Sequence, residues 1–191
     1  MVQSGGLEIH VRGSRLDSLE TCDRIVFDLD PGEGVAWRQI VAAAREIRDR
    51  LAAEKLESFV KLSGGKGIHV VVPVDDVDWD TAKEFSGRIA ARMSAANPKL
   101  YLAKMTKALR GGHIFIDYFR NSREATSIAA YSTRARPGAP VSAPVTWEEI
   151  AGGVESEDFR LDNMPARVEK LGDLWKPLLQ PAKRVKLDQF L

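Results

Sequence analysis

The chain has 191 residues, enough to bury the core of one domain or of one domain with an appendage. Its 28 basic and 27 acidic residues leave a net charge of +1, which indicates no class of partner, so nucleic-acid binding would need a local basic surface. The single cysteine, Cys22, excludes an intramolecular disulfide, and no apolar run is long enough to span a membrane. With no signal-peptide pattern, these features predict a cytoplasmic protein.

Strands and helices are predicted to alternate along the chain. Apolar runs of period two, bounded by turn residues, predict strands at 7–11, 24–30, 58–63, 68–74 and 113–119. Apolar residues at helical spacing predict helices at 35–57, 78–96 and 146–153. Asp80 or Thr81 is expected to cap the second helix. This order predicts an α+β fold with helices on one face of a sheet, in which residues 1–150 form the core and residues 151–191 a peripheral appendage.

Two aspartates follow the apolar run of the segment RIVFDLDPGEG, residues 24–34. On a strand, residues i and i+2 point to the same face, so Asp28 and Asp30 are expected to project together from the strand end. Their like charges repel unless something positive lies between them, and a hard divalent cation takes carboxylate oxygens. The segment therefore predicts a cation site.

A glycine loop joins the two central strands in the segment KLSGGKGIHVVV, residues 61–72. Glycines on both sides of Lys66 allow positive φ and can present several N–H groups to an anion. Ser63 adds a hydroxyl, and His69 points to the face opposite Ile68. The pattern indicates a phosphate site, although an ordinary hairpin turn with a solvated lysine also satisfies it. A Walker A loop is excluded because the glycine spacing differs and no helix follows.

A third carboxylate, Asp117, lies near the end of the strand expected at 113–119. By itself it could equally form a turn or an ion pair. Beside Asp28 and Asp30 it completes a set of three carboxylates, which can hold two divalent ions about 3.5–4 Å apart for phosphoryl or nucleotidyl transfer.

Two arginines follow in the segment SIAAYSTRARPG, residues 127–138. Arg134 and Arg136 alternate on what is expected to be an extended segment, so both guanidinium groups would face the same way and could clamp a polyphosphate. Ordinary surface charge is the alternative. The neighbouring glycine loop and acidic site favour phosphate binding.

Together, the segments FDLDPGEG, SGGKGIHVVVP, IFIDYFRN and AYSTRARPGAP resemble the polymerase domain of bacterial DNA ligase D. That domain belongs to the archaeo-eukaryotic primase superfamily and serves end joining. The motifs occur in the family's order at matching intervals, and the match extends from about Leu7 through Trp147. The resemblance implies a primase-polymerase core, with an RRM-like mixed or antiparallel sheet and helices packed on it.

The resemblance also implies a role for each motif. Asp28, Asp30 and Asp117 would be catalytic ligands of Mg²⁺ or Mn²⁺ in a two-metal site. A nucleoside triphosphate such as ATP would be bound by Ser63, Gly64, Gly65, Lys66, His69, Arg134 and Arg136.

The implied activity is DNA-directed nucleotidyl transfer, in which a primer 3′-hydroxyl attacks the α-phosphate of a nucleotide and pyrophosphate leaves. Ribonucleotides are the expected substrates. The implied partners are nucleoside triphosphates, DNA ends or a primer-template, and the ligase and Ku-type proteins of end joining, with no membrane. The implied location is the bacterial cytoplasm, at the nucleoid.

Two features depart from the family pattern. Arg12 stands where the family usually has Trp, and the LEIH strand begins almost at Met1, without the long segment that precedes it in the family. We therefore expect the chain alone to bind nucleotide and metal, to bind DNA weakly with strong salt dependence, and to extend primers poorly. A residual basic patch could be formed by Arg12, Arg15, Lys104, Lys107 and Arg110.

Two other functions are compatible with parts of the pattern. One is a remnant that binds nucleotide and metal without efficient polymerase activity. The other is a phosphatase of the haloacid dehalogenase type, which also places two aspartates one residue apart after a strand. Parallel strands need crossovers of a dozen or more residues, and only GGKG separates the two central strands here, so the phosphatase is the weaker alternative.

Overall fold

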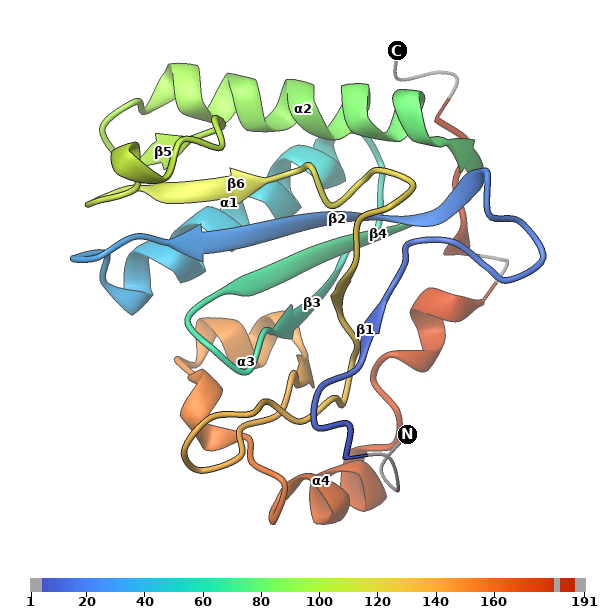
Figure 1. Cartoon of the computed structure of the whole chain (residues 1–191), viewed down its shortest axis with the longest axis vertical. Helices are drawn as coiled ribbons and strands as arrows, with labels where there is room; N and C mark the ends of the chain where they lie inside the picture. The colour runs from blue at the N-terminus through green and yellow to red at the C-terminus, as the bar shows by residue number, and fades with distance from the viewer. Residues whose placement is uncertain (1–4, 181–182, 188–191) are drawn as a thin grey trace.

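A computed structural model describes residues 5–180 and 183–187 of the chain. Its centre is a six-stranded sheet with the order β5-β6-β2-β4-β3-β8 (Figure 1). Neighbouring strands are antiparallel except β5 and β6, which are parallel. The strands are β2 (Thr21–Pro31), β3 (Phe59–Leu62), β4 (Ile68–Asp78), β5 (Tyr101–Leu102), β6 (Ile114–Asp117) and β8 (Pro144–Val145). The predicted mixed α+β sheet is confirmed.

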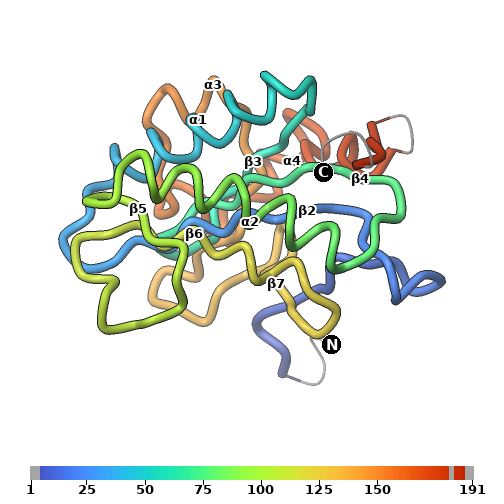
Figure 2. Tube along the Cα trace, turned by 90° about the horizontal axis from the view of Figure 1, so that it is seen from above, coloured from blue at the N-terminus to red at the C-terminus, as the bar shows by residue number. Residues whose placement is uncertain are grey.

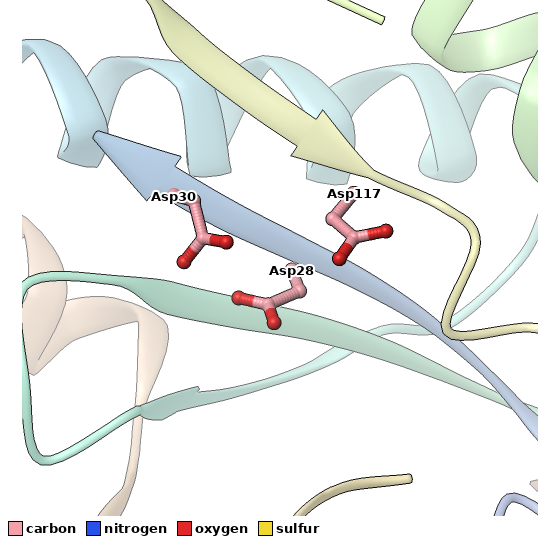
Figure 3. Close-up of side chains that lie close together, drawn as sticks. All are labelled: Asp28, Asp30 and Asp117. Carbon is pink, nitrogen blue, oxygen red and sulfur yellow. The ribbon is translucent and has the colours of Figure 1, made fainter. Parts of the chain in front are cut away.

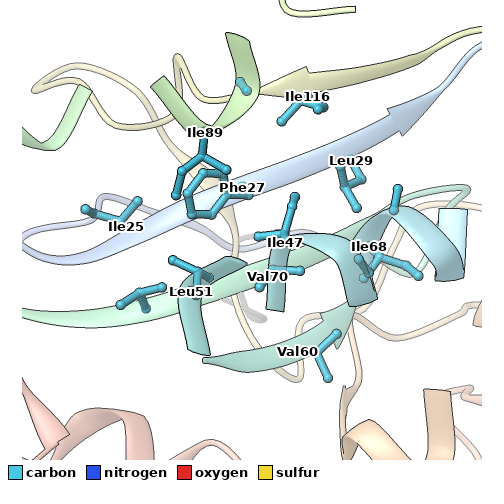
Figure 4. Close-up of a cluster of buried hydrophobic side chains, with 14 of the residues drawn as sticks. Ile25, Phe27, Leu29, Ile47, Leu51, Val60, Ile68, Val70, Ile89 and Ile116 are labelled. Atoms are coloured by element: carbon cyan, nitrogen blue, oxygen red, sulfur yellow. The ribbon is translucent and has the colours of Figure 1, made fainter. Parts of the chain in front are cut away.

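One face of the sheet is covered by two long helices, α1 (Trp37–Ala53) and α2 (Trp79–Ala96). Their apolar sides meet the inward residues of β2 and β4 in one continuous core, as Figure 4 shows around Phe27, Ile47 and Ile89. Because β2 alternates between faces, its residues Phe27 and Leu29 enter this core while Asp28 points to the opposite face. Burial of one face therefore fixes which side of the sheet presents the acidic residues.

The opposite face carries a second, smaller sheet and part of the C-terminal region. β1 (His10–Val11) pairs with β7 (Ser127–Ile128), and both cross in front of the main sheet (Figures 1 and 2). At one end of this face, Trp175 and Leu178 pack on residues of β2 and β4. The same face carries Asp28 and Asp30, which line a cleft together with His10, Ser127 and Ile128 of the small sheet.

Residues after 150 form short elements around the sheet. They include a helix α4 (Met164–Leu171) and a 3-10 turn at Lys176–Leu179, and they follow α3 (Trp147–Ala151). Leu187 is fully buried in the main core, and Val185 bridges to Val74. The division into a core of 1–150 and an appendage of 151–191 stays a prediction.

Several local expectations are corrected. Asp78, not Asp80 or Thr81, caps α2, because its side chain accepts a hydrogen bond from the Thr81 N–H at 2.9 Å. The strand expected at 7–11 is only two residues long, His10–Val11, and pairs with β7 outside the main sheet. The alternation of apolar residues in this segment therefore did not predict a strand of the main sheet. Among residues 5–180 and 183–187, no helix combines the length and apolar character needed to cross a membrane.

Candidate functional site

Three aspartates meet on the open face of the sheet. Asp28 and Asp30 come from β2, and Asp117 comes from β6 directly opposite Asp28. Each offers a carboxylate oxygen, and these oxygens all lie within 4.8 Å of one another (Figure 3). The structure thus brings together the three carboxylates that the sequence pattern had grouped, through the period of β2 and the register between β2 and β6.

A row of charged side chains crosses four neighbouring strands through this point. In the strand register, Asp117 lies opposite Asp28, Asp28 opposite His69, and His69 opposite Lys61. His69 Nε2 lies 3.2 Å from an Asp28 oxygen, and Lys61 Nζ donates to the Ser142 hydroxyl at 2.9 Å. All four charged residues are buried. His69 therefore faces the acidic site as expected. Lys61, which was not among the predicted site residues, belongs to the same row.

Arg120 is a second cation that the sequence reasoning missed. Its Nε lies 3.1 Å from Asp28 Oδ2 and 3.2 Å from Asp117 Oδ2, so one guanidinium bridges two of the three aspartates. Its Nη1 also donates to the Thr126 carbonyl at 3.4 Å. The sequence feature that could have identified Arg120 is its position three residues after Asp117, just beyond the end of the predicted strand.

The protonation equilibria of the site reflect burial first and crowded negative charge second. Burial, together with Asp28 and Asp117, raises the pKa of Asp30 to about 7. Burial also raises the pKa of Asp117, although Arg120 opposes this shift. Burial alone would raise the pKa of Asp28 as well, but His69, Arg120 and Lys61 hold it below its ordinary value. Asp30 is therefore the carboxylate whose charge the protein compensates least, and a bound cation would satisfy it.

The two buried bases of the row are shifted toward their neutral forms. Burial lowers the pKa of Lys61 from 10.5 to about 7, against the attraction of Asp28. Burial likewise lowers the pKa of His69, which Asp28 opposes. In the neutral ring, a proton on Nε2 can be donated to Asp28, which leaves Nδ1 as an acceptor.

The glycine loop forms the predicted hairpin connection between β3 and β4. The Ser63 N–H donates to the Gly67 carbonyl at 3.0 Å, and the Gly67 N–H donates to the Ser63 hydroxyl at 3.1 Å. Gly64 has a φ of +68°, and a Cβ at Gly67 would lie 2.6 Å from the Leu29 carbonyl oxygen. Glycine is thus required where the loop closes against β2, beside the aspartates. Lys66 is exposed at its tip.

The two arginines of the segment 127–138 lie against this loop in a different way from that expected. The chain bends after Arg134, whose carbonyl accepts from the Arg136 N–H at 2.8 Å, so the segment is not uniformly extended. Arg134 donates to the Ser63 carbonyl at 2.7 Å and to Glu8 at 3.1 Å. The Arg136 guanidinium carbon would lie 3.2 Å from a Cβ at Gly65. Arg134 is therefore committed to protein contacts, and Arg136 is the more available of the two.

Glu8 is a further unanticipated residue near the loop. Its carboxylate accepts hydrogen bonds from the Ala135 N–H at 2.9 Å and from Arg134. These contacts, with the Ala135 N–H contributing most, lower its pKa to about 2. Glu8 thus ties the N-terminal segment to the bend that carries the arginines.

A cleft of about 590 Å³ opens over the site. Its volume lies in the range of small-molecule sites. The predicted residues that line it are Asp28, Asp30, Ser63, Gly65, Lys66, His69, Arg134 and Arg136. The lining residues that were not predicted include His10, Arg120, Thr126, Ser127 and Ile128. Of the other predicted residues, Asp117 contacts Arg120, and Gly64 packs against Arg134.

Two arginines of the expected basic patch are held in ion pairs outside the cleft. Arg12 pairs with Glu124 at 3.4 Å, and Arg15 pairs with Asp17 and Asp76. Arg110 instead stacks on Phe115, with its guanidinium carbon 4.2 Å from the ring centroid, and reaches the cleft. Of these three arginines, only Arg110 lines the site.

An open-faced mixed sheet that carries three carboxylates beside a glycine loop and several basic groups defines a candidate nucleotide-binding site. Comparison with known proteins agrees: the family model described as the LigD primase-polymerase domain matches residues 1–175. The chain belongs to this family. The resemblance to the polymerase domain of bacterial DNA ligase D and the predicted α+β fold are therefore confirmed.

The relatives named LigD are much longer proteins. A multifunctional non-homologous end joining protein LigD from Mycolicibacterium smegmatis is 40% identical over 181 residues, which cover 93% of this chain and 24% of that protein. The LigD protein from Pseudomonas aeruginosa is 37% identical over 187 residues, which cover 96% of this chain and 22% of that protein. The chain thus spans about a quarter of the length of these curated relatives.

A solved structure gives the same result for the fold. The polymerase domain from Mycobacterium tuberculosis ligase D in complex with DNA superposes with a TM-score of 0.84 at 38% identity, covering 92% of this chain and 64% of that one. The phosphatase alternative fits poorly, because β3 and β4 are antiparallel and joined directly by the glycine loop.

Proposed function

We propose that this chain is the nucleotidyltransferase core of an end-joining DNA repair polymerase, which adds ribonucleotides to a primer 3′-hydroxyl. The observation that carries the proposal is that carboxylate oxygens of Asp28, Asp30 and Asp117 lie within 4.8 Å of one another, beside a cleft that Asp28, Asp30 and the glycine loop line. Membership of the LigD primase-polymerase family supports it. The partners in the proposal are DNA ends or a primer-template, with ligase and Ku-type proteins.

The three aspartates would hold Mg²⁺ or Mn²⁺. Carboxylate oxygens are the ligands that these hard cations take, and burial, together with the charges of Asp28 and Asp117, raises the pKa of Asp30, which a bound cation would offset. When bound, such ions activate the attacking hydroxyl and neutralise charge on the leaving pyrophosphate.

The other residues of the cleft would bind and orient the nucleotide. Lys66 and Arg136 can reach triphosphate oxygens from the loop tip and the bend, and Arg134 holds the loop through the Ser63 carbonyl. His69 keeps the Asp28 carboxylate oriented through Nε2. In this proposal the protein accelerates the reaction by positioning the reactants and by preorganised charge.

Metal and nucleotide titrations with single variants test the proposal. Asp117→Ala should abolish Mn²⁺-dependent binding of a nucleoside triphosphate, whereas Asp162→Ala, an exposed aspartate that does not line the cleft, should not change it. Lys66→Ala and Arg136→Ala should each weaken triphosphate binding by about 1.5–3 kcal/mol, the range for hydrogen bonds to charged groups. Equal affinity for a nucleoside and its triphosphate would contradict the phosphate assignment.

Primer extension, measured beside binding, distinguishes the possible activities. Addition of ribonucleotides to a primer supports the polymerase. Metal-dependent binding without extension would instead identify a nucleotide-binding remnant, and release of inorganic phosphate would identify a phosphatase. Preference for ribonucleotides is tested by competition between matched ribo- and deoxyribonucleoside triphosphates in the same assay.

A further inference from the structure

An aromatic stack lies just beyond the end of β6, next to the acidic site. The ring of Phe119 stacks on Tyr118, with the ring centroids 4.3 Å apart and an interplanar angle of 26°. Its centroid lies 6.4 Å from that of Phe115, at an interplanar angle of 25°. The Phe119 N–H donates to Asp117 Oδ1 at 3.0 Å. The residue at the centre of the stack therefore also holds a carboxylate of the candidate metal site.

Helix α2 supports this stack. A Cβ at Gly87 would lie 3.0 Å from Tyr118 Cε2, so the glycine allows Tyr118 to pack closely on the helix. Glycine is among the least favourable residues inside a helix, and the close approach of Tyr118 gives it a structural use here. One turn earlier, Lys83 places its ammonium over the Phe119 ring, 5.7 Å from the centroid. Lys83 is exposed, so this cation can move away from the ring.

Phe119 and Lys83 together have the features of a site for single-stranded nucleic acid. Base stacking needs an aromatic face that solvent reaches, and Phe119 is half-buried rather than enclosed. A base that replaces Lys83 on the ring leaves the ammonium free to pair with the adjacent phosphate. The stack thus offers an aromatic face and a mobile positive charge beside the carboxylates.

The strand order places this stack on one side of the aspartates and the phosphate-binding groups on the other. β2 lies between β6, which leads to Phe119, and β4, which begins at the glycine loop. In-line transfer puts the attacking hydroxyl and the leaving group on opposite sides of the phosphorus. With the pyrophosphate held by Lys66 and Arg136, the primer 3′-hydroxyl has to arrive from the side of β6.

We propose that Phe119 is the stacking platform for the base at the 3′ end of the primer strand, and that Lys83 moves from the ring to a neighbouring phosphate when the strand binds. This inference rests on the proposed function and adds the residues that position its primer. Stacking holds the terminal nucleotide so that its 3′-hydroxyl faces the α-phosphate beside Asp28 and Asp117. Because every base has a π face, the platform accepts any primer sequence.

Direct binding tests the platform without turnover. The probe is a short single-stranded DNA with 2-aminopurine as its 3′-terminal base, because the fluorescence of this base is quenched when it stacks. At low salt and without nucleotide, the wild-type protein should quench the probe on binding. Phe119→Leu, which fills space without a flat ring, should bind it about 5- to 100-fold more weakly, and Phe119→Trp should bind it as the wild type does. Lys83→Gln should reduce the slope of log affinity against log salt by about 0.7.

Phe59→Leu and Lys170→Gln are the matched controls, and neither should change probe binding. Phe59 is also half-buried in an aromatic contact, with Trp175, but it lies on β3, beyond β4. Lys170 is exposed on α4. In primer extension, Phe119→Leu should raise KM for the primer by the factor seen in binding and leave KM for the nucleotide unchanged.

The outcomes separate this inference from the function on which it rests. Unchanged probe binding by Phe119→Leu would overturn the inference alone, because metal and nucleotide binding are measured separately. Weaker nucleotide binding by this variant would also overturn it, since Phe119 would then hold the incoming base or act through Asp117. If the wild-type protein neither binds the probe nor extends a primer, the inference and the proposed polymerase function fail together. Weak probe binding by Phe119→Leu that Phe119→Trp restores would establish the aromatic face as the primer platform.

Discussion

Replacing Lys61 by Met should make the protein more stable and should do so in a pH-dependent way. Lys61 is buried with an exposed fraction of 3%, and within the described part of the chain its ammonium donates one hydrogen bond, to the Ser142 hydroxyl. Burial lowers its pKa from 10.5 to about 7, so the folded protein holds this proton less tightly than the unfolded chain does. A methionine fills a similar volume without a charge to desolvate.

The size of the effect follows from proton linkage. One pKa unit corresponds to about 1.4 kcal/mol, so the depressed pKa costs about 3–5 kcal/mol of folding free energy at pH 7. Loss of the hydrogen bond to Ser142 offsets about 1 kcal/mol. Lys61→Met should therefore raise the free energy of unfolding by about 2–4 kcal/mol at pH 7.

The sign of the pH dependence is opposite to that of a lysine in a favourable ion pair. Between pH 7 and 10.5 the unfolded chain keeps the Lys61 proton and the folded protein loses it, so the stability of the wild type rises with pH relative to the variant. By pH 10 the penalty should have fallen below about 1 kcal/mol. The advantage of Lys61→Met should thus disappear across this window.

Urea unfolding followed by circular dichroism at pH 7, 8, 9 and 10, in metal-free buffer, measures the difference directly. Lys99→Met, at an exposed position, is the control for other groups that titrate in this range. A stability difference between Lys61→Met and the wild type that is independent of pH would refute the reasoning. It would mean that the charged lysine is accommodated in the folded protein, by Asp28 or by water, at no cost.

Three other predictions concern the metal site, the loop and the sheet. Because the pKa of Asp30 is raised to about 7 and the metal needs an ionised carboxylate, Mn²⁺ affinity should rise from pH 6 to 8, with proton release below pH 7 in calorimetry; a flat profile would contradict this. Gly67→Ala should destabilise the protein by about 1–3 kcal/mol and weaken nucleotide binding, since its Cβ would meet the Leu29 carbonyl at 2.6 Å. Asn121→Ala should cost about 2–4 kcal/mol in urea unfolding, because the buried side chain bonds both backbone groups of Val26, and a smaller loss would mean that water replaces it.

Much of the candidate site follows from short-range rules. The period of two along β2 places Asp28 and Asp30 on one face, and the apolar residues between and before them decide that this face is opposite the helices. The loop GGKG is too short for anything except an antiparallel connection, which sets Lys61 opposite His69 once the pairing of Leu62 with Ile68 is known. Lys61 could thus have been found from the sequence by extending the hairpin register.

Other features depend on contacts that no local pattern contains. The strand order places β2 between β4 and β6, and only this order brings Asp28 between His69 and Asp117. The bend at Arg134 is held by Glu8, 126 residues away along the chain, so an extended segment was a reasonable but wrong expectation. Arg120 lies beyond the end of β6, where its direction depends on the Thr126 carbonyl and the two aspartates.

The sequence by itself determined which carboxylates, glycines and cations are candidates for the site, because they occur together in the order and spacing of one family. Only the tertiary structure decided which of them are already paired. The oxygens of Asp28 and Asp117 have partners in Arg120, His69 and a backbone N–H, whereas no residue within 5–180 and 183–187 forms a hydrogen bond or ion pair with the Asp30 carboxylate. That difference depends on distances between strands and loops far apart in the chain, and charge interactions change steeply with distance and burial, so residue types and spacing alone do not specify them.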